Sequence, residues 1–309
     1  MTPEVEIREV GPRDGLQIEH PIPTAAKLEL LTALAATGVR RIEATSFVSP
    51  RAVPALADAE AVAAELVRWP HIAFSALVAG VGGVRRALAA GVTELEYVVS
   101  ASDGHSRANV GRSVQDSIAL IAPIAELVHA AGGHLEVIVA IAFDCPFDGR
   151  TPPARVAEIA GRAADSGADS LSIADTVGTA TPVRTTDVLT RVRAAVPELE
   201  LGIHLHDTRG QGLANAWAAY TLGIRRFDAS VGGLGGCPFA PGASGNIATE
   251  ELAYLFEDGG IATGIDIAAV LDAARLAGRL LGRPLSSALL AAGGPLVPAP
   301  EPPRDGVTP

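Results

Sequence analysis

The sequence predicts an α/β chain that folds as a closed (β/α)8 barrel with a helical extension after the eighth unit. Short apolar runs rich in β-branched residues recur eight times, and each is followed by a longer Ala- and Leu-rich stretch with helical spacing. Alternating β and α elements favour a parallel sheet, and eight repeats in one chain favour closure into a barrel. The length of 309 residues is typical of a barrel that forms one domain.

Each expected strand is four to nine residues long. The stretches 27–38 and 153–167 are typical of the helices between them, since both combine helical spacing with a final glycine. A further helix is expected at about 266–282. We therefore predict a barrel domain with its C-terminal helices at residues 1–285 and a flexible Pro-rich tail at 286–309. The eight strands are expected at 5–10, 40–45, 71–77, 94–100, 135–143, 170–175, 200–206 and 225–231.

The alternative is an open, doubly wound sheet. Such a fold usually has a glycine-rich phosphate loop after its first strand. Here VEIREV is followed by GPRDGLQ, which lacks the G-x-G-x-x-G spacing. The sequence therefore favours the closed form, the (β/α)8 or TIM barrel.

Composition narrows the functional classes. The formal net charge of −11, without Lys/Arg runs, argues against nucleic-acid binding. Two cysteines make no disulfide framework, which favours a reducing compartment. The N-terminal stretch is typical of neither a signal nor a transit peptide, and no apolar run reaches membrane-spanning length. We expect a cytoplasmic protein without nucleic-acid or membrane partners.

A barrel places its catalytic groups at the carboxyl ends of the strands. Polar side chains with catalytic or ligand chemistry gather there in this sequence, after the first, second, sixth, seventh and eighth strands. They are Arg13, Asp14, Gln17, Glu43, Ser46, Asp175, Thr176, His204, His206 and Asn246.

His204 and His206 give the sharpest local signal. Residues i and i+2 of a strand face the same side, so both imidazoles are expected to point toward the barrel axis. They form either half of a metal site or a pair of buried, hydrogen-bonded histidines. Asp14 and Asn246 follow adjacent strands and add oxygen donors. This donor set suits Mg²⁺ or Mn²⁺, and Zn²⁺ is a further option.

Arg13 keeps its charge and presents a fixed fork of donors. At the top of a barrel it can polarise a carbonyl or stabilise an enolate oxygen. It can equally form a salt bridge to Glu43 or Asp175, and both descriptions are compatible. Glu43 is therefore either that partner or a catalytic base.

Cys237 lies in GGLGGCPFAPGASGN, residues 232–246. Cysteine is often a small buried apolar residue, but this one stands between Gly236 and Pro238 in a loop with little to pack. A glycine-rich loop can approach a ligand closely, and a thiol near a metal or an arginine can perform acid–base chemistry. For Cys145, at the end of the fifth strand, a packed thiol is the simpler interpretation.

Four stretches resemble hydroxymethylglutaryl-CoA lyases, a family of metal-dependent barrels. They are EVGPRDGLQ, IEATSFVSP, HLHDT and GGLGGCPFAPGASGN, and the resemblance runs from about residue 4 to about residue 280. It implies Asp14, His204, His206 and Asn246 as ligands of a divalent metal. It also implies catalytic roles for Arg13, Glu43, Asp175 and Cys237.

The resemblance implies retro-Claisen cleavage of 3-hydroxy-3-methylglutaryl-CoA to acetyl-CoA and acetoacetate, a step of leucine breakdown and ketone-body formation. It also implies an acyl-CoA partner and a homodimer. Cys237 would mediate proton transfer to the new methyl carbon. Contacts with the substrate are expected from Gln17, Ser46, Thr176 and Arg107.

Two stretches depart from the family pattern. The loop SASDGHSRANVGRSV follows the fourth strand, and IEH follows RDGLQ, where His20 replaces a familiar lysine. His105 in the first of these is expected to contact an anionic ligand. Both departures leave the reaction type intact and keep a different 3-hydroxyacyl-CoA substrate open. The remaining alternative is a Claisen-condensing synthase of the same barrel type.

Overall fold

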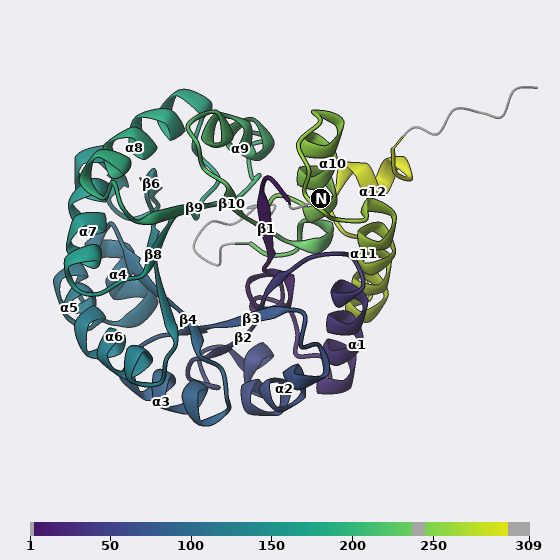
Figure 1. Ribbon diagram of the computed structural model, residues 1–309, viewed down its shortest axis with the longest axis horizontal. Helices are drawn as coiled ribbons and strands as arrows, with labels where there is room; N and C mark the ends of the chain where they lie inside the picture. The colour runs from purple at the N-terminus through teal and green to yellow at the C-terminus, as the bar shows by residue number, and fades with distance from the viewer. Residues whose placement is uncertain (1–2, 237–244, 296–309) are drawn as a thin grey trace, which may run out of the picture.

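The computed structural model describes residues 3–236 and 245–295, and it confirms the predicted barrel. Within these residues, eight parallel strands close in the order β1-β10-β9-β8-β5-β4-β3-β2 (Figure 1). The strands are β1 Glu6–Glu9, β2 Arg41–Phe47, β3 Ala73–Val78, β4 Glu94–Ser100, β5 His134–Ala140, β8 Ser170–Asp175, β9 Glu200–Leu205 and β10 Arg226–Ala229.

Helices surround the barrel as an outer ring (Figure 1). Most of the buried Ala, Val, Leu and Ile side chains, including most of those on the strands, form one large cluster. A second, small cluster consists of Ala140, Ile141, Cys145 and Val177. The helices are α1 Thr24–Ala35, α2 Ala59–Glu65, α3 Val81–Ala89, α4 Asp103–Val110, α5 Val114–Ala119, α6 Ile121–Ala130, α7 Pro153–Asp165, α8 Pro182–Ala195, α9 Gly212–Thr221, α10 Thr249–Asp258, α11 Ile267–Leu281 and α12 Ala288–Ala292. No helix of the described chain is both long enough and apolar enough to span a membrane.

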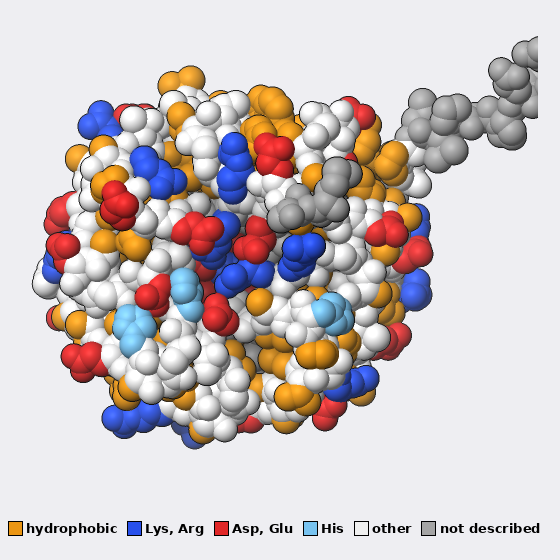
Figure 2. All heavy atoms as spheres, viewed as in Figure 1, with side chains coloured by type: hydrophobic (Ala, Val, Ile, Leu, Met, Phe, Trp, Pro, Cys, Tyr) orange, Lys and Arg blue, Asp and Glu red, His pale blue; other side chains and the backbone are white. Residues whose placement is uncertain are grey.

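The charged residues of the strands point into the barrel, opposite to the apolar residues that face the helices. Alternate positions of β1, β4 and β10 carry Arg8, Glu96 and Asp228, all buried. Because the apolar positions pack outward against helices, these charged side chains fill the barrel interior. Acidic and basic side chains gather at the centre of the face shown in Figure 2.

Two features differ from the predicted elements. The expected fifth strand ends at Ala140, and residues 144–150 form a small antiparallel hairpin of β6 Asp144–Cys145 and β7 Gly149–Arg150. Cys145 thus lies in this hairpin, where it is buried.

The first residues of the predicted tail, from 286 onward, include the short helix α12 Ala288–Ala292. Ser287 caps α12 by accepting a hydrogen bond from the backbone N–H of Leu290 at 3.1 Å, and Glu251 of α10 accepts one from that of Leu289 at 3.2 Å. The start of the expected tail is therefore helical and is anchored to α10.

Candidate active site

A single π-helical turn, Gly11–Gly15, follows β1 and carries Arg13 and Asp14. The backbone N–H groups of Asp14 and Gly15 both donate to the carbonyl of Val10, at 2.7 and 3.2 Å. Such wide turns are rare and concentrate at functional sites because they redirect side chains. Here the turn buries both side chains, and Arg13 and Asp14 are each 6% exposed.

His204 lies in β9 and His206 directly follows it, as predicted. Both imidazoles are buried, and their ring centroids are 5.1 Å apart. One ligand atom from each of them and one from Asp14 lie within 4.8 Å of one another. The predicted convergence of the first and seventh strand ends is therefore confirmed.

Asn246 reaches the same place along a short backbone pairing with the end of β9. The segment runs antiparallel to it at His206, with Asp207 N donating to the Gly245 carbonyl at 2.9 Å. Its side-chain Nδ2 donates to Asp14 Oδ2 at 2.7 Å and to the Leu234 carbonyl at 2.9 Å.

Gly235 explains why the segment before Asn246 is rich in glycine. Its φ is +119°, and a Cβ built on it would lie 2.5 Å from Asn246 Nδ2 and 3.3 Å from Asp14 Oδ2. Any side chain at this position would collide with the site, so only glycine lets the backbone pass. The base of the glycine-rich loop thus lies directly against Asn246 and Asp14.

The residues present fit a divalent cation. Asn246 Oδ1 is buried and lacks a hydrogen-bond partner among the described residues, although a buried carbonyl oxygen normally has one. Burial alone would raise the pKa of Asp14, but Arg13, His206 and His204 together hold it well below its usual range. The site therefore offers an ionised carboxylate, two imidazoles and an unused amide oxygen, a donor set suited to Mg²⁺ or Mn²⁺.

Asp14, His204, His206 and Asn246 together form the ligand cluster. Arg13 lies between this cluster and Glu43 of β2. Its Nη1 donates to Asp14 Oδ1 at 2.8 Å, and its Nε is 2.6 Å from Glu43 Oε1. The salt bridge to Glu43, one of the two predicted alternatives, is thus present. Burial and the neighbouring Glu96 nevertheless raise the pKa of Glu43 well above its usual value, against the opposing effect of Arg13.

Asp175 ends β8 and is almost fully buried. Its two carboxylate oxygens accept backbone N–H bonds from Thr179 at 3.0 Å and Ala180 at 2.8 Å, which fix its orientation. Burial raises the pKa of Asp175. The adjacent Thr176 accepts a hydrogen bond through Oγ1 from the backbone N–H of Ile141 at 3.0 Å.

The other predicted contacts divide into two groups. Gln17 Nε2 donates to Asp14 Oδ1 at 2.7 Å, and Ser46 is buried in β2. Arg107 lies on α4 with 68% of its side chain exposed, and it faces Asp103 at 4.0 Å. The structure thus places Gln17 beside the ligand cluster and leaves Arg107 at the surface.

The two remaining predicted residues are Cys237 and His105. Cys237 lies outside the described residues. His105 is buried on α4, where its Nδ1 lies 3.1 Å from Ser100 Oγ. Burial lowers the pKa of His105 to about 4, and the expected contact with an anionic ligand stays a prediction.

The sequence interpretation missed the charged residues below the ligand cluster. Asp228 Oδ2 lies 3.1 Å from His204 Nδ1, and it also contacts Arg8. Glu9 lies under the turn that carries Asp14. The period-two alternation in EIRE and RFDA was the available signal, because a charged residue inside a strand covered by helices must point into the barrel.

Comparisons with known proteins identify the family of this chain. The family model described as HMGL-like matches residues 4–277. The chain belongs to the HMGL-like family. The predicted family resemblance is thereby confirmed. The family match also supports the general prediction that the protein is a lyase of this family.

Three relatives have about 40% sequence identity to this chain over most of its length. The (R)-citramalyl-CoA lyase of Chloroflexus aurantiacus is 42% identical, covering 95% of this chain and 96% of the relative. The mitochondrial hydroxymethylglutaryl-CoA lyase of Mus musculus is 41% identical, covering 92% and 88%. An HMG-CoA lyase from A. baumannii, solved in complex with coenzyme A and 3-methylmalate, is 42% identical with a TM-score of 0.90, covering 96% and 98%.

Proposed function

We propose that this protein is a divalent-metal-dependent lyase that cleaves 3-hydroxy-3-methylglutaryl-CoA into acetyl-CoA and acetoacetate. The observation that carries the proposal is the convergence of Asp14, His204, His206 and Asn246 beside Arg13. The identity of 41% to a lyase named for this substrate supports the assignment.

The reaction needs a proton acceptor, a stabiliser of negative charge and a proton donor. The hydroxyl proton on C3 leaves, the C2–C3 bond breaks, and its electron pair moves into the thioester to form an enolate. C2 then takes up a proton and becomes the methyl group of acetyl-CoA. A cation held by the four ligands would make the C3 hydroxyl more acidic and orient the substrate.

Arg13 is suited to stabilise the enolate oxygen. Burial lowers the pKa of its guanidinium, but Glu43 and Asp14 outweigh this and raise it further above its usual value. The group is therefore a permanent cation that is already oriented before substrate binds. A preorganised donor of this kind stabilises charge that develops in the transition state.

Asp175 is our candidate for the group that takes the hydroxyl proton. Its orientation is fixed by two backbone N–H groups, and burial shifts its pKa upward, toward the range useful for a general base. Glu43, whose pKa burial also raises, forms the ion pair that holds Arg13 in place.

Cys237 is the proposed donor of the proton to C2. It lies outside the described residues, so this role depends on the family resemblance and on the anchoring of its loop. The described base of that loop approaches the ligand cluster at Gly235 and Asn246. A Cys237→Ser variant should bind metal normally and lose most of its cleavage activity.

A second candidate substrate is (R)-citramalyl-CoA, favoured by the 42% identity to the Chloroflexus lyase over nearly the whole chain. Its carboxylate is attached directly to the hydroxyl-bearing carbon, so cleavage would yield acetyl-CoA and pyruvate. The same metal ligands and the same Arg13 would serve both substrates. The two substrates differ only in the distance between the hydroxyl-bearing carbon and the carboxylate, so the space around that carboxylate would decide between them.

The test compares both thioesters on metal-restored enzyme by kcat/KM, with acetoacetate and pyruvate measured as separate products. We expect the higher kcat/KM with 3-hydroxy-3-methylglutaryl-CoA. A clear preference for (R)-citramalyl-CoA would reassign the substrate within the same chemistry. Failure to cleave either compound while Mn²⁺ is bound would overturn the proposed lyase.

A further inference from the structure

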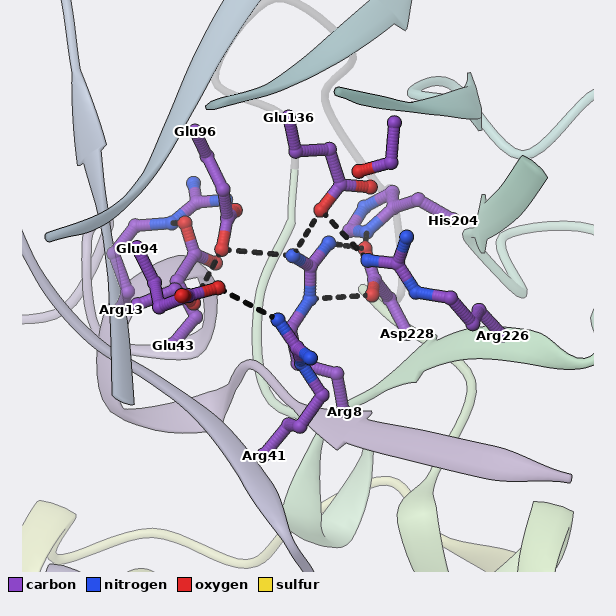
Figure 3. Close-up of polar contacts among 12 residues, drawn as sticks. Arg8, Arg13, Arg41, Glu43, Glu94, Glu96, Glu136, His204, Arg226 and Asp228 are labelled. Carbon is purple, nitrogen blue, oxygen red and sulfur yellow. Dashed lines mark hydrogen bonds and ion pairs between the residues drawn. The ribbon is translucent and has the colours of Figure 1, made fainter. Parts of the chain in front are cut away.

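A cluster of buried ions lies inside the barrel beneath the proposed metal ligands. Arg8 of β1 is at its centre (Figure 3), with Nη1 at 2.8 Å from Glu96 and 2.5 Å from Glu136. Its Nε and Nη2 donate to the two carboxylate oxygens of Asp228 at 2.8 and 2.9 Å. All four side chains are at most 7% exposed.

Strand register places one edge of this cluster next to the metal site. Asp228 of β10 pairs with Arg8 of β1 on one side and with His204 of β9 on the other. The three residues therefore share one level of the barrel and point to the same side. A metal ligand, a carboxylate and an arginine thus follow one another across three adjacent strands.

The contact between Asp228 and His204 determines which nitrogen of the His204 ring can bind a metal. Asp228 Oδ2 lies 3.1 Å from His204 Nδ1. The guanidinium of Arg8 donates to both oxygens of Asp228, at 2.8 and 2.9 Å, which is the pairing of a cation with an ionised carboxylate. An ionised carboxylate only accepts hydrogen bonds, so Nδ1 carries the proton and the lone pair of Nε2 is left for a metal.

We infer that Asp228, clamped by Arg8, is a positioning residue that sets the tautomer and orientation of His204. Carboxylates in this role typically change metal affinity by about 10- to 100-fold. His206 differs, because its Nδ1 is buried and lacks a hydrogen-bond partner within residues 3–236 and 245–295. The two histidines are therefore not equivalent ligands. The inference depends on the metal site of the proposed function.

Mn²⁺ binding tests the inference without using activity. The apo-protein is titrated with Mn²⁺, and free Mn²⁺ is measured by electron paramagnetic resonance. Asp228→Asn is expected to weaken binding about 10- to 100-fold. The matched control is Glu136→Gln, which alters a carboxylate on the same Arg8 that does not touch His204, and its affinity should stay near that of the wild type.

The outcomes separate the two proposals. Equal affinity of wild type and a folded Asp228→Asn variant would overturn the positioning role while leaving the metal site intact. Equal loss in Glu136→Gln would also overturn it, because the effect would then belong to the whole ion cluster. Absence of Mn²⁺ binding by the wild type would overturn the metal site of the proposed function, and this inference with it.

A second measurement uses the wild-type protein and so does not depend on how a variant folds. Long-range ¹H–¹⁵N spectra of the Mg²⁺-loaded protein with ¹⁵N-labelled histidine report the tautomer of each ring, and a His204→Gln variant assigns the signal. We expect His204 to carry its proton on Nδ1. A proton on Nε2 would refute the role of Asp228.

Discussion

Glu9 joins three parts of the active end of the barrel through one buried carboxyl group. Its Oε1 accepts backbone N–H bonds from Gly11 at 2.8 Å and Val231 at 2.9 Å, and its Oε2 accepts the hydroxyl of Thr249 at 2.6 Å. Gly11 begins the turn that carries Asp14, Val231 begins the glycine-rich segment, and Thr249 begins α10. Burial raises the pKa of Glu9 to about 7 from an ordinary value of 4.5.

Glu9→Gln should fit this site without loss of hydrogen bonds. The amide oxygen can accept both backbone N–H groups, and the amide nitrogen can donate to Thr249 if its hydroxyl turns. The folded wild type binds the Glu9 proton more tightly than the unfolded chain does. This contribution to stability is complete below pH 4.5 and is lost as the pH rises through about 7. The difference between the two pKa values corresponds to about 3 kcal/mol.

The assay is urea unfolding of wild type and Glu9→Gln between pH 5 and pH 8. The free energy of unfolding of the variant, relative to wild type, should increase by about 2.5 kcal/mol across this window, because part of the contribution is already lost at pH 5. Glu60→Gln is the control, since the exposed Glu60 has a lowered pKa and should show no change above pH 5. A constant difference between wild type and Glu9→Gln from pH 5 to pH 8 would refute the reasoning.

Three further substitutions test other parts of the structure. Arg13→Lys removes the guanidinium fork and should lower kcat about 100- to 1000-fold in steady-state assays, and a kcat near that of the wild type would exclude the proposed role. Asn246→Ala removes the unused amide oxygen and should weaken Mn²⁺ binding at least about tenfold by electron paramagnetic resonance, whereas unchanged affinity would remove it from the ligand set. Lys27→Met removes the contact between the buried Lys27 and the partly exposed Asp58, and it should cost about 1 to 3 kcal/mol of stability with kcat retained. Thermal unfolding measures this cost, and an unchanged melting temperature would contradict the prediction.

The barrel was predictable because its signals are local and repeated. Each strand is a short β-branched run and each covering helix an apolar-periodic stretch, so the order of elements determines the topology. The site was predictable for the same reason. Once the first, seventh and eighth strands are adjacent, Asp14, His204, His206 and Asn246 must meet at one end, which the structure confirms.

The interior ion cluster was not predicted, because its contacts join residues distant in sequence. Arg8 and Asp228 are 220 residues apart, and Arg8 and Glu136 are 128 apart. Their pairing depends on barrel register, which the strand pattern does not specify by itself. The π-helical turn at Gly11–Gly15 was also missed, since it depends on three N–H groups, those of Arg13, Asp14 and Gly15, sharing the Val10 carbonyl.

The hairpin after β5 shows how local pattern misleads. The apolar run 135–143 continues past the end of the strand at Ala140. Ile141 has a φ of +60°, a strained value for a β-branched residue, and this turns the chain out of the sheet. Hydrogen bonds to Thr176 and Thr151 hold it there. The turn is therefore imposed by tertiary contacts that the sequence pattern does not reveal.

The central claim is metal-dependent carbon–carbon cleavage at the cluster of Asp14, His204, His206 and Asn246. The most direct measurement adds 3-hydroxy-3-methylglutaryl-CoA to chelator-stripped enzyme before and after Mg²⁺ or Mn²⁺ is restored, and quantifies both products. We predict no cleavage without metal, and acetyl-CoA and acetoacetate in equal amounts with it. Cleavage that persists at full rate in the stripped enzyme, or no cleavage with the metal bound, would contradict the account.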